Sequence, residues 1–259
     1  MHLLFSSVLA SRGVPHAFTT RRGGCSRGVF ASLNFGNPGD LPEHERDPLT
    51  NIAANIGSVL IAIHAAEREV VQVHQMHGGD VHRVHRGHPA HAGASDTRAD
   101  AVITDDPRRV LGVRVADCAP VLLATEDGGI VAAVHAGWRG VIAGITPKAA
   151  LMMREVGAGR LVAAVGPCLS AEHFEIGAEV AAEFEREFGR GTAHLRPGAP
   201  GKAMLDMKGA IAEQLRSAGV EEIEVLPHCT YADPDLFFSH RRDRGRTGRM
   251  MAMIGPAGS

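Results

Sequence analysis

The sequence predicts a protein of the α/β or α+β class with a substantial β-sheet. Apolar segments of strand length and amphipathic segments of helix length are interspersed along the whole chain. No repeat and no long linker separates them, and 259 residues lie near the upper end of the length of one domain. Hydrophobic residues make up 44% of the chain and charged residues 22%, which is typical of a globular protein with a sizeable core. The order in which the strands pair does not follow from these patterns.

Residues 1–57 are expected to form a first strand or an extended arm, a second strand, a loop and one helix. Residues 1–18 contain a short apolar stretch that no Lys or Arg precedes, so they predict a first strand or an extended arm rather than a signal peptide. A strand beginning at His16 leads into a loop rich in Gly and Ser. Residues 41–57 contain a helical segment, which we expect to stop at Gly57.

The next part predicts two strands and a polar loop between them. β-Branched residues favour strands at 68–75 and 99–105, and the stretch 77–96 is polar and rich in Gly. This loop carries four spaced histidines, which are His82, His85, His88 and His91. A solvated loop explains them best, and an accessory patch that binds copper or nickel loosely is the alternative.

The C-terminal part carries the strongest core pattern. Residues 109–137 form two or three apolar strands, interrupted by an Asp-Cys-Ala-Pro break and a Glu-Asp-Gly-Gly turn. The remaining pattern predicts a helix at 141–157, with Pro147 near its start, and a strand at 160–168. Two amphipathic helices are expected at 178–189 and 206–219, ending at Gly189 and Gly219. The last expected strands are 221–229 and 248–255.

Charge and cysteine usage argue against several classes of protein. The net charge is −2 and the pI is about 6.7, so we expect no general attraction to nucleic acid or to an anionic membrane. No apolar run approaches the roughly 20 residues that a membrane span needs. The four cysteines lie far apart and form no Cys-x-x-Cys pair, which favours reduced thiols in the cytoplasm over a disulfide-bonded secreted protein.

Three side chains that can bind a metal stand where an apolar strand gives way to a turn containing Gly or Pro. They are His77, Cys118 and His135. Strand ends hold such side chains rigidly outside the packed layer, so two imidazoles and a thiolate there make a plausible three-ligand zinc site with an open fourth position. A buried inert cysteine or a hydrogen-bonded histidine is the more common role of each residue alone. In an extended segment His74 would point away from His77.

Arginines beside glycine-rich turns are candidates for binding an anion. Arg139 lies in a Gly-Trp-Arg-Gly turn, where its planar guanidinium would suit a phosphate or a carboxylate; stacking on Trp138 is the structural alternative. Arg21 stands between a strand and a glycine pair, and Arg241 and Arg242 follow the apolar stretch LFFS, so one arginine from each region is a further candidate.

Seven motifs follow one another along the chain. The first is TTRRGGCS followed by SLNFG, the second is VHQMHG, and the third is ADCAPVLL. The others are VHAGWRG, VGPC, FFSHRRD and TGRM. In this order they closely resemble the YfiH-like family, whose members carry the labels multicopper polyphenol oxidase and laccase-domain protein and are also described as purine nucleoside phosphorylases. The resemblance runs from Phe18 to Ile254. Met76 and Phe35 depart from the family's usual residues, and neither change removes a functional group.

The resemblance implies a fold and a set of site residues. The fold is one α/β domain of the α+β type over residues 1–259, with mixed β-sheets flanked by helices. The roles that the family motifs imply are zinc ligation by His77, Cys118 and His135. For the implied activity we expect catalysis by Arg139 and Asp117 and substrate binding by Arg21, Asn34 and Arg242.

The resemblance also implies a reaction. Its substrates are purine nucleosides and phosphate, and the protein is expected to act as a monomer or homodimer. The activities are phosphorolysis of adenosine, inosine, guanosine and methylthioadenosine, and deamination of adenosine. Zinc lowers the pKa of bound water to about 7, which suits attack at C6 of adenine, whereas phosphorolysis needs phosphate held against C1′ of the ribose. Asp117 would support the metal site or transfer a proton, or else serve as a structural turn residue.

Two other enzyme classes remain as alternatives. A copper-dependent polyphenol oxidase of the laccase type needs about ten histidine ligands, typically as His-x-His pairs, and the chain contains no such pair. Copper binding, if observed, is therefore expected to be adventitious. A hydrolase with Cys118 as nucleophile and His135 as base would suit peptidoglycan precursor editing. A non-catalytic binding protein is the weakest alternative, because the polar groups at the strand ends would then have no purpose.

Overall fold

The computed structural model describes residues 1–87 and 94–258, and in these the strands form two six-stranded sheets and one small sheet. The first sheet has the order β1 (Leu3–Leu4), β2 (His16–Thr19), β15 (Met250–Ile254), β7 (Arg109–Val115), β3 (Glu69–His74) and β5 (Ala94–Arg98). The second has the order β14 (Glu222–Val225), β10 (Leu161–Val165), β8 (Ala119–Thr125), β9 (Val131–Ala136), β6 (Ala101–Thr104) and β4 (Val81–Val84). Both sheets contain parallel and antiparallel pairs, so the expected mixed α/β architecture is confirmed.

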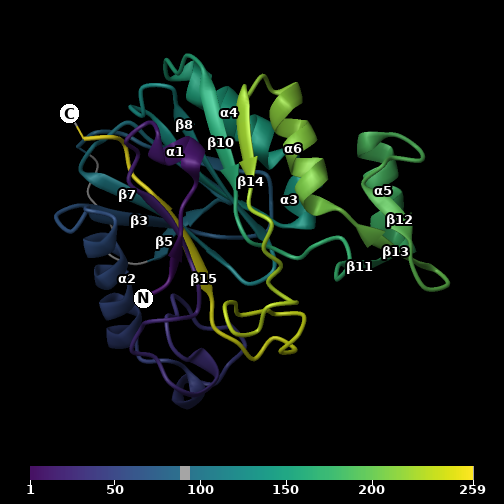
Figure 1. Ribbon diagram of the computed structural model, residues 1–259, viewed down its shortest axis with the longest axis horizontal. Helices are drawn as coiled ribbons and strands as arrows, with labels where there is room; N and C mark the ends of the chain where they lie inside the picture. Colours follow the sequence, from purple (N-terminus) through teal and green to yellow (C-terminus); the bar gives the residue numbers. More distant parts are fainter. Residues whose placement is uncertain (88–93, 259) are drawn as a thin grey trace.

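The two large sheets pack face to face, and helices cover their outer faces (Figure 1). The core between the sheets is lined by strand residues of both, such as Leu111 from β7 and Leu122 from β8. Helix α2 (Leu49–Ala62) covers the first sheet, and α4 (Ile145–Glu155) and α6 (Met207–Ser217) cover the second. The remaining helices are α1 (Ser7–Ala10), α3 (Trp138–Ile142), α5 (Ala178–Phe188) and the short 3-10 turns Gly28–Phe30 and Glu43–Glu45. The result is four layers in the order helix, sheet, sheet, helix.

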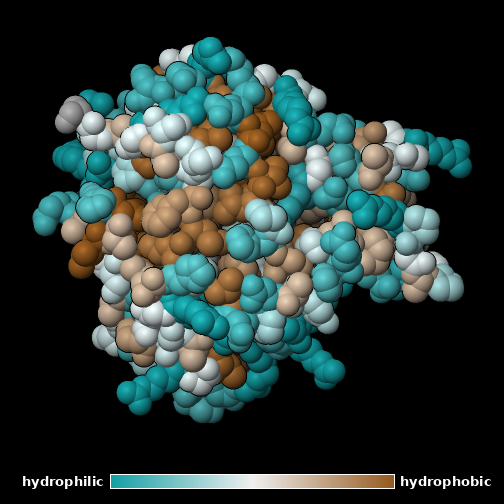
Figure 2. Space-filling view, viewed as in Figure 1, coloured by the Kyte–Doolittle hydropathy of each residue, from teal (hydrophilic) through white to brown (hydrophobic). Residues whose placement is uncertain are grey.

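The third sheet lies at one side of the main body, and Ile176 and Leu205 join it to the apolar core of the second sheet. It pairs β11 (Glu175–Gly177) and β12 (Leu195–Pro197) with the central strand β13 (Lys202–Leu205). Together with α5 it projects to one side of the molecule in Figure 1. In the space-filling view of the same face, apolar residues gather toward the centre and polar residues cover most of the rim (Figure 2). Among the described residues, no helix is both long enough and apolar enough to cross a membrane.

Local expectations failed at three places where packing overrides the sequence pattern. Helix α2 continues through Gly57 to Ala62, because Val59 and Leu60 extend its buried face and outweigh the roughly 1 kcal/mol cost of an internal glycine. Residues 1–18 form a two-residue strand, a short helix and the start of β2 instead of one arm. The expected polar loop at 77–96 contains β4 and most of β5, which pair with strands of the two sheets.

The other elements occur where the sequence predicts them. Strands β3 and β6 lie within 68–75 and 99–105, and three strands occupy 109–137. Helix α5 ends at Gly189, and Pro147 lies in the first turn of α4. Of the four spaced histidines, His82 and His85 lie on or just after β4, and His88 and His91 lie outside the described residues.

Two chain crossings between the large sheets position the functional site. The chain leaves β3 in the first sheet and enters β4 in the second through residues 75–80. It crosses again from β7 to β8 through residues 116–118. Strand β9 lies beside β8, with His135 opposite Pro120, so the end of β9 lies beside the second crossing. Residues far apart in the sequence therefore meet at one edge of the sandwich.

Candidate metal centre and active site

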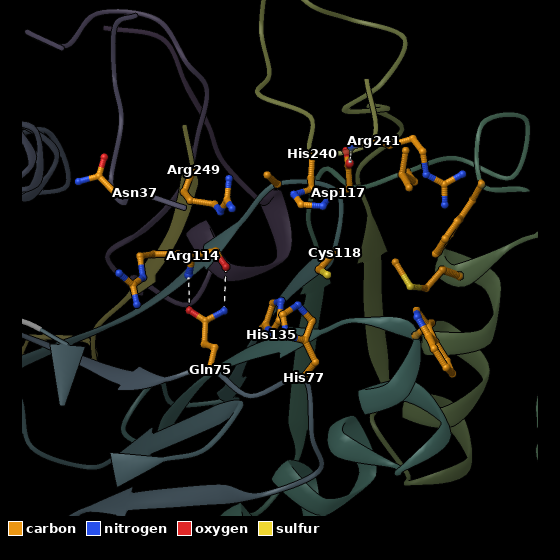
Figure 3. Close-up of a pocket in the computed structure, with 15 residues that line it drawn as sticks. Asn37, Gln75, His77, Arg114, Asp117, Cys118, His135, His240, Arg241 and Arg249 are labelled. Atoms are coloured by element: carbon orange, nitrogen blue, oxygen red, sulfur yellow. Dashed lines mark hydrogen bonds between the residues drawn. The ribbon is translucent and has the colours of Figure 1, made fainter. Parts of the chain in front are cut away.

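The structure brings His77, Cys118 and His135 together at this edge. One ligand atom from each residue lies within 4.8 Å of the others, and the two imidazole rings are 4.8 Å apart at 79° (Figure 3). His77 comes from the first crossing, Cys118 from the second, and His135 from β9. Two imidazole nitrogens and one thiolate form a donor set typical of three-ligand zinc sites, and of some copper sites. His135 is buried, Cys118 half-buried and His77 exposed, so a fourth position would open to solvent.

Gly137 leaves room for these donors. A Cβ atom at this position would lie 3.1 Å from Cys118 Sγ and 3.3 Å from His77 Cδ2. Both distances are shorter than ordinary carbon contacts, so a side chain here would push the thiol and the imidazole apart. Gly137 of the HAGWRG motif therefore lets the two candidate ligands approach closely without such a shift.

The carboxylate of Asp100 orients two of the three donors. Its Oδ1 lies 2.8 Å from Nδ1 of His135 and accepts the backbone N–H of His77 at 2.9 Å. Its Oδ2 accepts the N–H groups of Met76 at 3.1 Å and Gly78 at 2.6 Å. Because Asp100 engages Nδ1, the Nε2 atom of His135 is left for the metal site. The same bonds hold His77 in a left-handed conformation with φ of 60°.

Charges within the group favour an ionised thiol. Burial raises the pKa of Cys118, but the positive charge of His135 and hydrogen bonds from His135 and His77 outweigh it and lower the pKa to about 6. Burial lowers the pKa of His135, and the Cys118 thiolate and Asp100 together raise it to about 9. Burial raises the pKa of Asp100, but its hydrogen bonds with His135 and backbone N–H groups lower it overall. At neutral pH the thiolate is therefore available as a ligand.

The three donors face a cavity of about 430 Å³. This size lies within the range of small-molecule sites in proteins. The lining of the cavity combines positively charged and amide side chains with an apolar part. Its polar lining includes Asn37, Gln75, Arg114, His240, Arg241 and Arg249, and its apolar lining Trp138, Leu169, Phe174 and Met207 (Figure 3).

Three arginines line the cavity, and their guanidinium groups lack a carboxylate partner among the described residues: Arg114, Arg241 and Arg249. Arg241, one of the arginines expected from the sequence, donates through Nη1 to the backbone carbonyl of Glu175. Arg249 donates through Nη1 to the carbonyl oxygens of Thr247 and Gly248, and the Arg114 guanidinium donates to no described acceptor. Desolvation lowers the pKa of both, and the charge of Arg114 further lowers that of Arg249. The side-chain amide of Gln75 bonds the backbone N–H and C=O of Arg114 and fixes its position (Figure 3). The charges of Cys118, Asp117 and Asp40 partly offset that of Arg249, but neither Arg249 nor Arg114 forms an ion pair among the described residues. Guanidinium groups in this situation are suited to bind an anion.

Asp117 lines the cavity beside Cys118. Its φ is 88°, so its side chain points in a different direction from the one it would have in a regular strand. Oδ1 accepts the Thr230 hydroxyl at 2.7 Å, and Oδ2 accepts the backbone N–H of Arg241 at 2.6 Å. The carboxylate therefore joins two C-terminal loops to the chain segment that carries a metal-site donor.

Two arginines expected in the site lie outside the lining of the cavity. Arg139 is exposed, and its guanidinium lies 4.2 Å from the centre of the Trp138 ring. Its Gly-Trp-Arg-Gly segment is the first turn of α3 rather than an isolated turn. Arg21 lies over the Phe238 ring at 4.5 Å and donates to the carbonyl oxygens of Ala31 and Pro234.

Arg242 and Asn34 are likewise held in structural contacts outside the lining. The Arg242 guanidinium donates to the Asp243 carboxylate and to three backbone carbonyl groups of the C-terminal loops. Asn34 is buried, donates to Asp47 and accepts the backbone N–H of Arg249. These contacts make Asn34 a support for the arginine that lines the cavity.

Sequence reasoning did not identify Asp100, Gln75, Arg114 or Arg249. Asp100 begins an apolar strand and has no motif of its own, and Arg249 belongs to the TGRM motif without a sign of its role. The one available sign was Arg114, the charged residue within the apolar run VLGVRV. His74, by contrast, is exposed at the end of β3 and takes no part in the donor cluster, as expected.

Comparison with known proteins identifies the family. The family described as multi-copper polyphenol oxidoreductase laccase matches residues 15–257. A protein of Deinococcus radiodurans named purine nucleoside phosphorylase is 39% identical over 245 residues, which cover 93% of this chain and 89% of that protein. The protein of Escherichia coli named purine nucleoside phosphorylase YfiH is 34% identical over 247 residues, covering 94% of each chain.

Solved structures agree with this result. The crystal structure of YlmD from Geobacillus stearothermophilus superposes with a TM-score of 0.84 at 32% identity, covering 98% of this chain and 94% of the other. The crystal structure of a hypothetical protein YfiH from Bacillus licheniformis gives a TM-score of 0.87 at 30% identity, covering 98% and 96%. The chain belongs to the YfiH-like, laccase-domain family.

Proposed function

We propose that this protein is a zinc-dependent purine nucleoside phosphorylase. The observation that carries the proposal is the position of the His77, Cys118 and His135 cluster on a cavity that is also lined by arginines without an ion-pair partner among the described residues, which include Arg114 and Arg249. The names of the relatives from Deinococcus radiodurans and Escherichia coli support the same activity. The proposed nucleosides are adenosine, inosine, guanosine and methylthioadenosine, and the proposed second activity is deamination of adenosine.

The donor set fits zinc. His77, Cys118 and His135 would hold the ion, and Asp100 would fix the tautomer of His135. Bound there, zinc would supply Lewis-acid chemistry, which means polarisation of a substrate group and activation of water near neutral pH. A multicopper oxidase needs several copper centres, and the described residues provide one such donor cluster, so this observation favours zinc over laccase chemistry.

Arg114 and Arg249 are the proposed phosphate-binding residues, in place of Arg139, Arg21 and Arg242. In phosphorolysis a phosphate oxygen forms a bond to C1′ of the ribose while the bond from C1′ to the purine nitrogen breaks. Two guanidinium groups would hold phosphate against that carbon and offset its charge.

The rest of the cavity suits a purine. Trp138 and Phe174 belong to its apolar lining and offer aromatic surface to the base. The departing base takes the electron pair of the broken bond and needs a proton. His240 lines the cavity and is the proposed donor of that proton.

The proposal is tested with tag-free protein of known metal content, incubated with adenosine and phosphate. Chromatography should resolve adenine and ribose 1-phosphate if phosphorolysis occurs, and inosine if deamination occurs. His77→Ala, Cys118→Ala and His135→Ala should each lose bound zinc and turnover, because three ligands leave no spare donor. His74→Ala is the matched control and should retain both. Absence of both products, with phenol oxidation that persists after mild chelation, would contradict the proposal.

A cysteine hydrolase is the second candidate, because the lowered pKa of Cys118 and its contact with His135 also describe an activated nucleophile. Peptidoglycan precursor editing would be a reaction of this class. The two candidates differ in their response to inhibitors. Loss of activity on chelation, restored by zinc, supports the metal enzyme. Loss on alkylation of Cys118 without metal release supports the hydrolase.

A further inference from the structure

A second group of reactive side chains lies beside the active site. Cys229, His173 and Ser170 come together where the chain after β10 meets the chain after β14. Cys168 lies in the same group, because it pairs with Cys229 in an isolated parallel β-bridge. None of these residues is a metal-site donor or lines the cavity described above.

The surroundings of Cys229 favour its thiolate. The Ser170 N–H donates to Sγ at 3.4 Å, and Nδ1 of His173 lies 3.7 Å from Sγ and 3.2 Å from the Ser170 hydroxyl. Burial raises the pKa of Cys229, but hydrogen bonds from Ser170 and from the backbone N–H groups of Tyr231 and Ala232 lower it overall. Cys229 is only half-buried, so a small reagent in solvent can reach it.

Cys168 has the opposite character. It is fully buried, and burial, together with the negative charges of the other thiolates including Cys229, raises its pKa to about 12. Neighbouring strands lie about 4.8 Å apart, which is within the range of Cα separations that a disulfide can join. A thiol that stays protonated in this position does not react first with an external oxidant, and it becomes a nucleophile only as it gives up its proton to the group that leaves an oxidised neighbour.

Both cysteines immediately precede residues that hold Asp117. The N–H of Leu169, next to Cys168, donates to the Asp117 carbonyl at 3.1 Å. The hydroxyl of Thr230, next to Cys229, donates to the Asp117 carboxylate at 2.7 Å. Asp117 in turn precedes Cys118 in the metal centre. A covalent bond between the two cysteines would therefore change the support of the active site.

We infer that Cys229 and Cys168 form a redox pair that reacts with hydroperoxides and lowers the activity of the adjacent site. The Cys229 thiolate attacks one peroxide oxygen, an S–O bond forms, the O–O bond breaks, and the second oxygen leaves as hydroxide. Sulfur is oxidised to a sulfenic acid and the peroxide is reduced. The Cys168 sulfur then attacks this sulfur as its proton passes to the departing hydroxide, so that an S–S bond forms, the S–O bond breaks and water is released.

The test uses the metal-loaded protein treated with hydrogen peroxide, and peptide mass spectrometry as its main readout. With dimedone present to trap sulfenic acid, Cys229 should be labelled at least tenfold faster than Cys25, the exposed control thiol. Without dimedone, a peptide linked through Cys168 and Cys229 should appear and should vanish on treatment with dithiothreitol. His173→Gln should slow the labelling of Cys229, since it removes the imidazole and keeps a side chain of similar size.

Variants connect this chemistry to activity. Cys168→Ala should accumulate the labelled sulfenic acid and form no linked peptide. In the wild type, nucleoside turnover should fall on oxidation and recover with dithiothreitol, whereas Cys168→Ala should lack this recoverable loss. The activity readout rests on the proposed function, but the mass-spectrometric one does not. Labelling of Cys229 no faster than that of Cys25, or linkage of a different cysteine pair, would overturn the inference.

Discussion

Replacement of Asp100 by Asn tests whether one buried carboxylate organises the metal centre. Asp100 accepts three backbone N–H groups of the 76–78 turn and contacts Nδ1 of His135. An asparagine side chain keeps one oxygen and replaces the other by an NH₂ group. If the NH₂ group takes the place of Oδ2, it faces the N–H groups of Met76 and Gly78. If it takes the place of Oδ1, it faces the N–H of His77 and the His135 ring. Donors face donors in both orientations.

The magnitude follows from the bonds lost. Hydrogen bonds to charged groups contribute about 1.5–3 kcal/mol each, and a buried donor left unpaired adds to the loss. Two such bonds give a loss of about 3 kcal/mol or more in the free energy of unfolding. Loss of the carboxylate behind a metal-binding histidine typically costs 10–100-fold in metal affinity, or about 1.4–2.8 kcal/mol. We therefore expect Asp100→Asn to bind zinc 10–100-fold more weakly.

Two assays separate these effects. Competition with a chromophoric chelator measures zinc affinity, and urea unfolding of the metal-free protein measures stability. Asp127→Asn is the matched control, since Asp127 also accepts a hydroxyl and a backbone N–H, from Thr125 and Gly129, but in an exposed turn away from the site. Zinc affinity in Asp100→Asn equal to that of Asp127→Asn would refute the organising role of this carboxylate.

Three further predictions follow from the same structure. Arg249→Gln should raise the KM for phosphate about tenfold or more without loss of zinc, whereas Arg139→Gln should leave both nearly unchanged; equal effects in steady-state kinetics would count against the assignment. In the metal-free protein His135 keeps its proton up to about pH 9, and the metal must displace it, so zinc affinity should rise about tenfold per pH unit from pH 6 to 9 and then level off in a titration series. Asp106→Asn should lower the free energy of unfolding by about 2 kcal/mol at pH 7, because the hydrogen bond from Arg108 lowers the pKa of Asp106 from 3.8 to about 2. This stability is present above pH 3.8 and is lost as the pH falls through 2, so the difference between variant and wild type in urea unfolding should shrink to about 0.4 kcal/mol at pH 2. A difference at pH 2 as large as that at pH 7 would contradict the reasoning.

Most of the individual strands and helices could be predicted from the sequence. Apolar periodicity and turn residues act over a few positions, so they located β7, β8, β9, α5 and α6 close to where the structure has them. The same local rules failed for α2, which continues through Gly57. There the buried contacts of Val59 and Leu60 with the first sheet decide the length of the helix.

The metal donors were also accessible from the sequence, but their partners were not. His77, Cys118 and His135 each stand at the end of a strand, next to Gly or Pro, and this local pattern together with the family motifs selects them. Asp100 lies 23 residues from His77 and 35 from His135, and no local pattern connects it to either. It reaches His135 because β6 and β9 pair antiparallel in the second sheet, which places the start of β6 beside the end of β9. It reaches His77 because the chain from β3 leads into β4, the other neighbour of β6.

The choice of the proposed phosphate-binding residues depended on tertiary structure most of all. By sequence alone Arg139, Arg21 and Arg242 are as well placed as any arginine, since each adjoins a glycine-rich turn or an apolar stretch. In the folded chain their guanidinium groups are directed to an aromatic ring or to carbonyl oxygens. Arg114 and Arg249 face the cavity instead, because β7 and β15 pair antiparallel and bring the two residues to the same edge of the sheet. The sequence determined which groups can bind a metal or an anion, whereas the pairing of distant strands decided which of them share a cavity, since side-chain direction there is fixed by contacts between residues far apart in the chain.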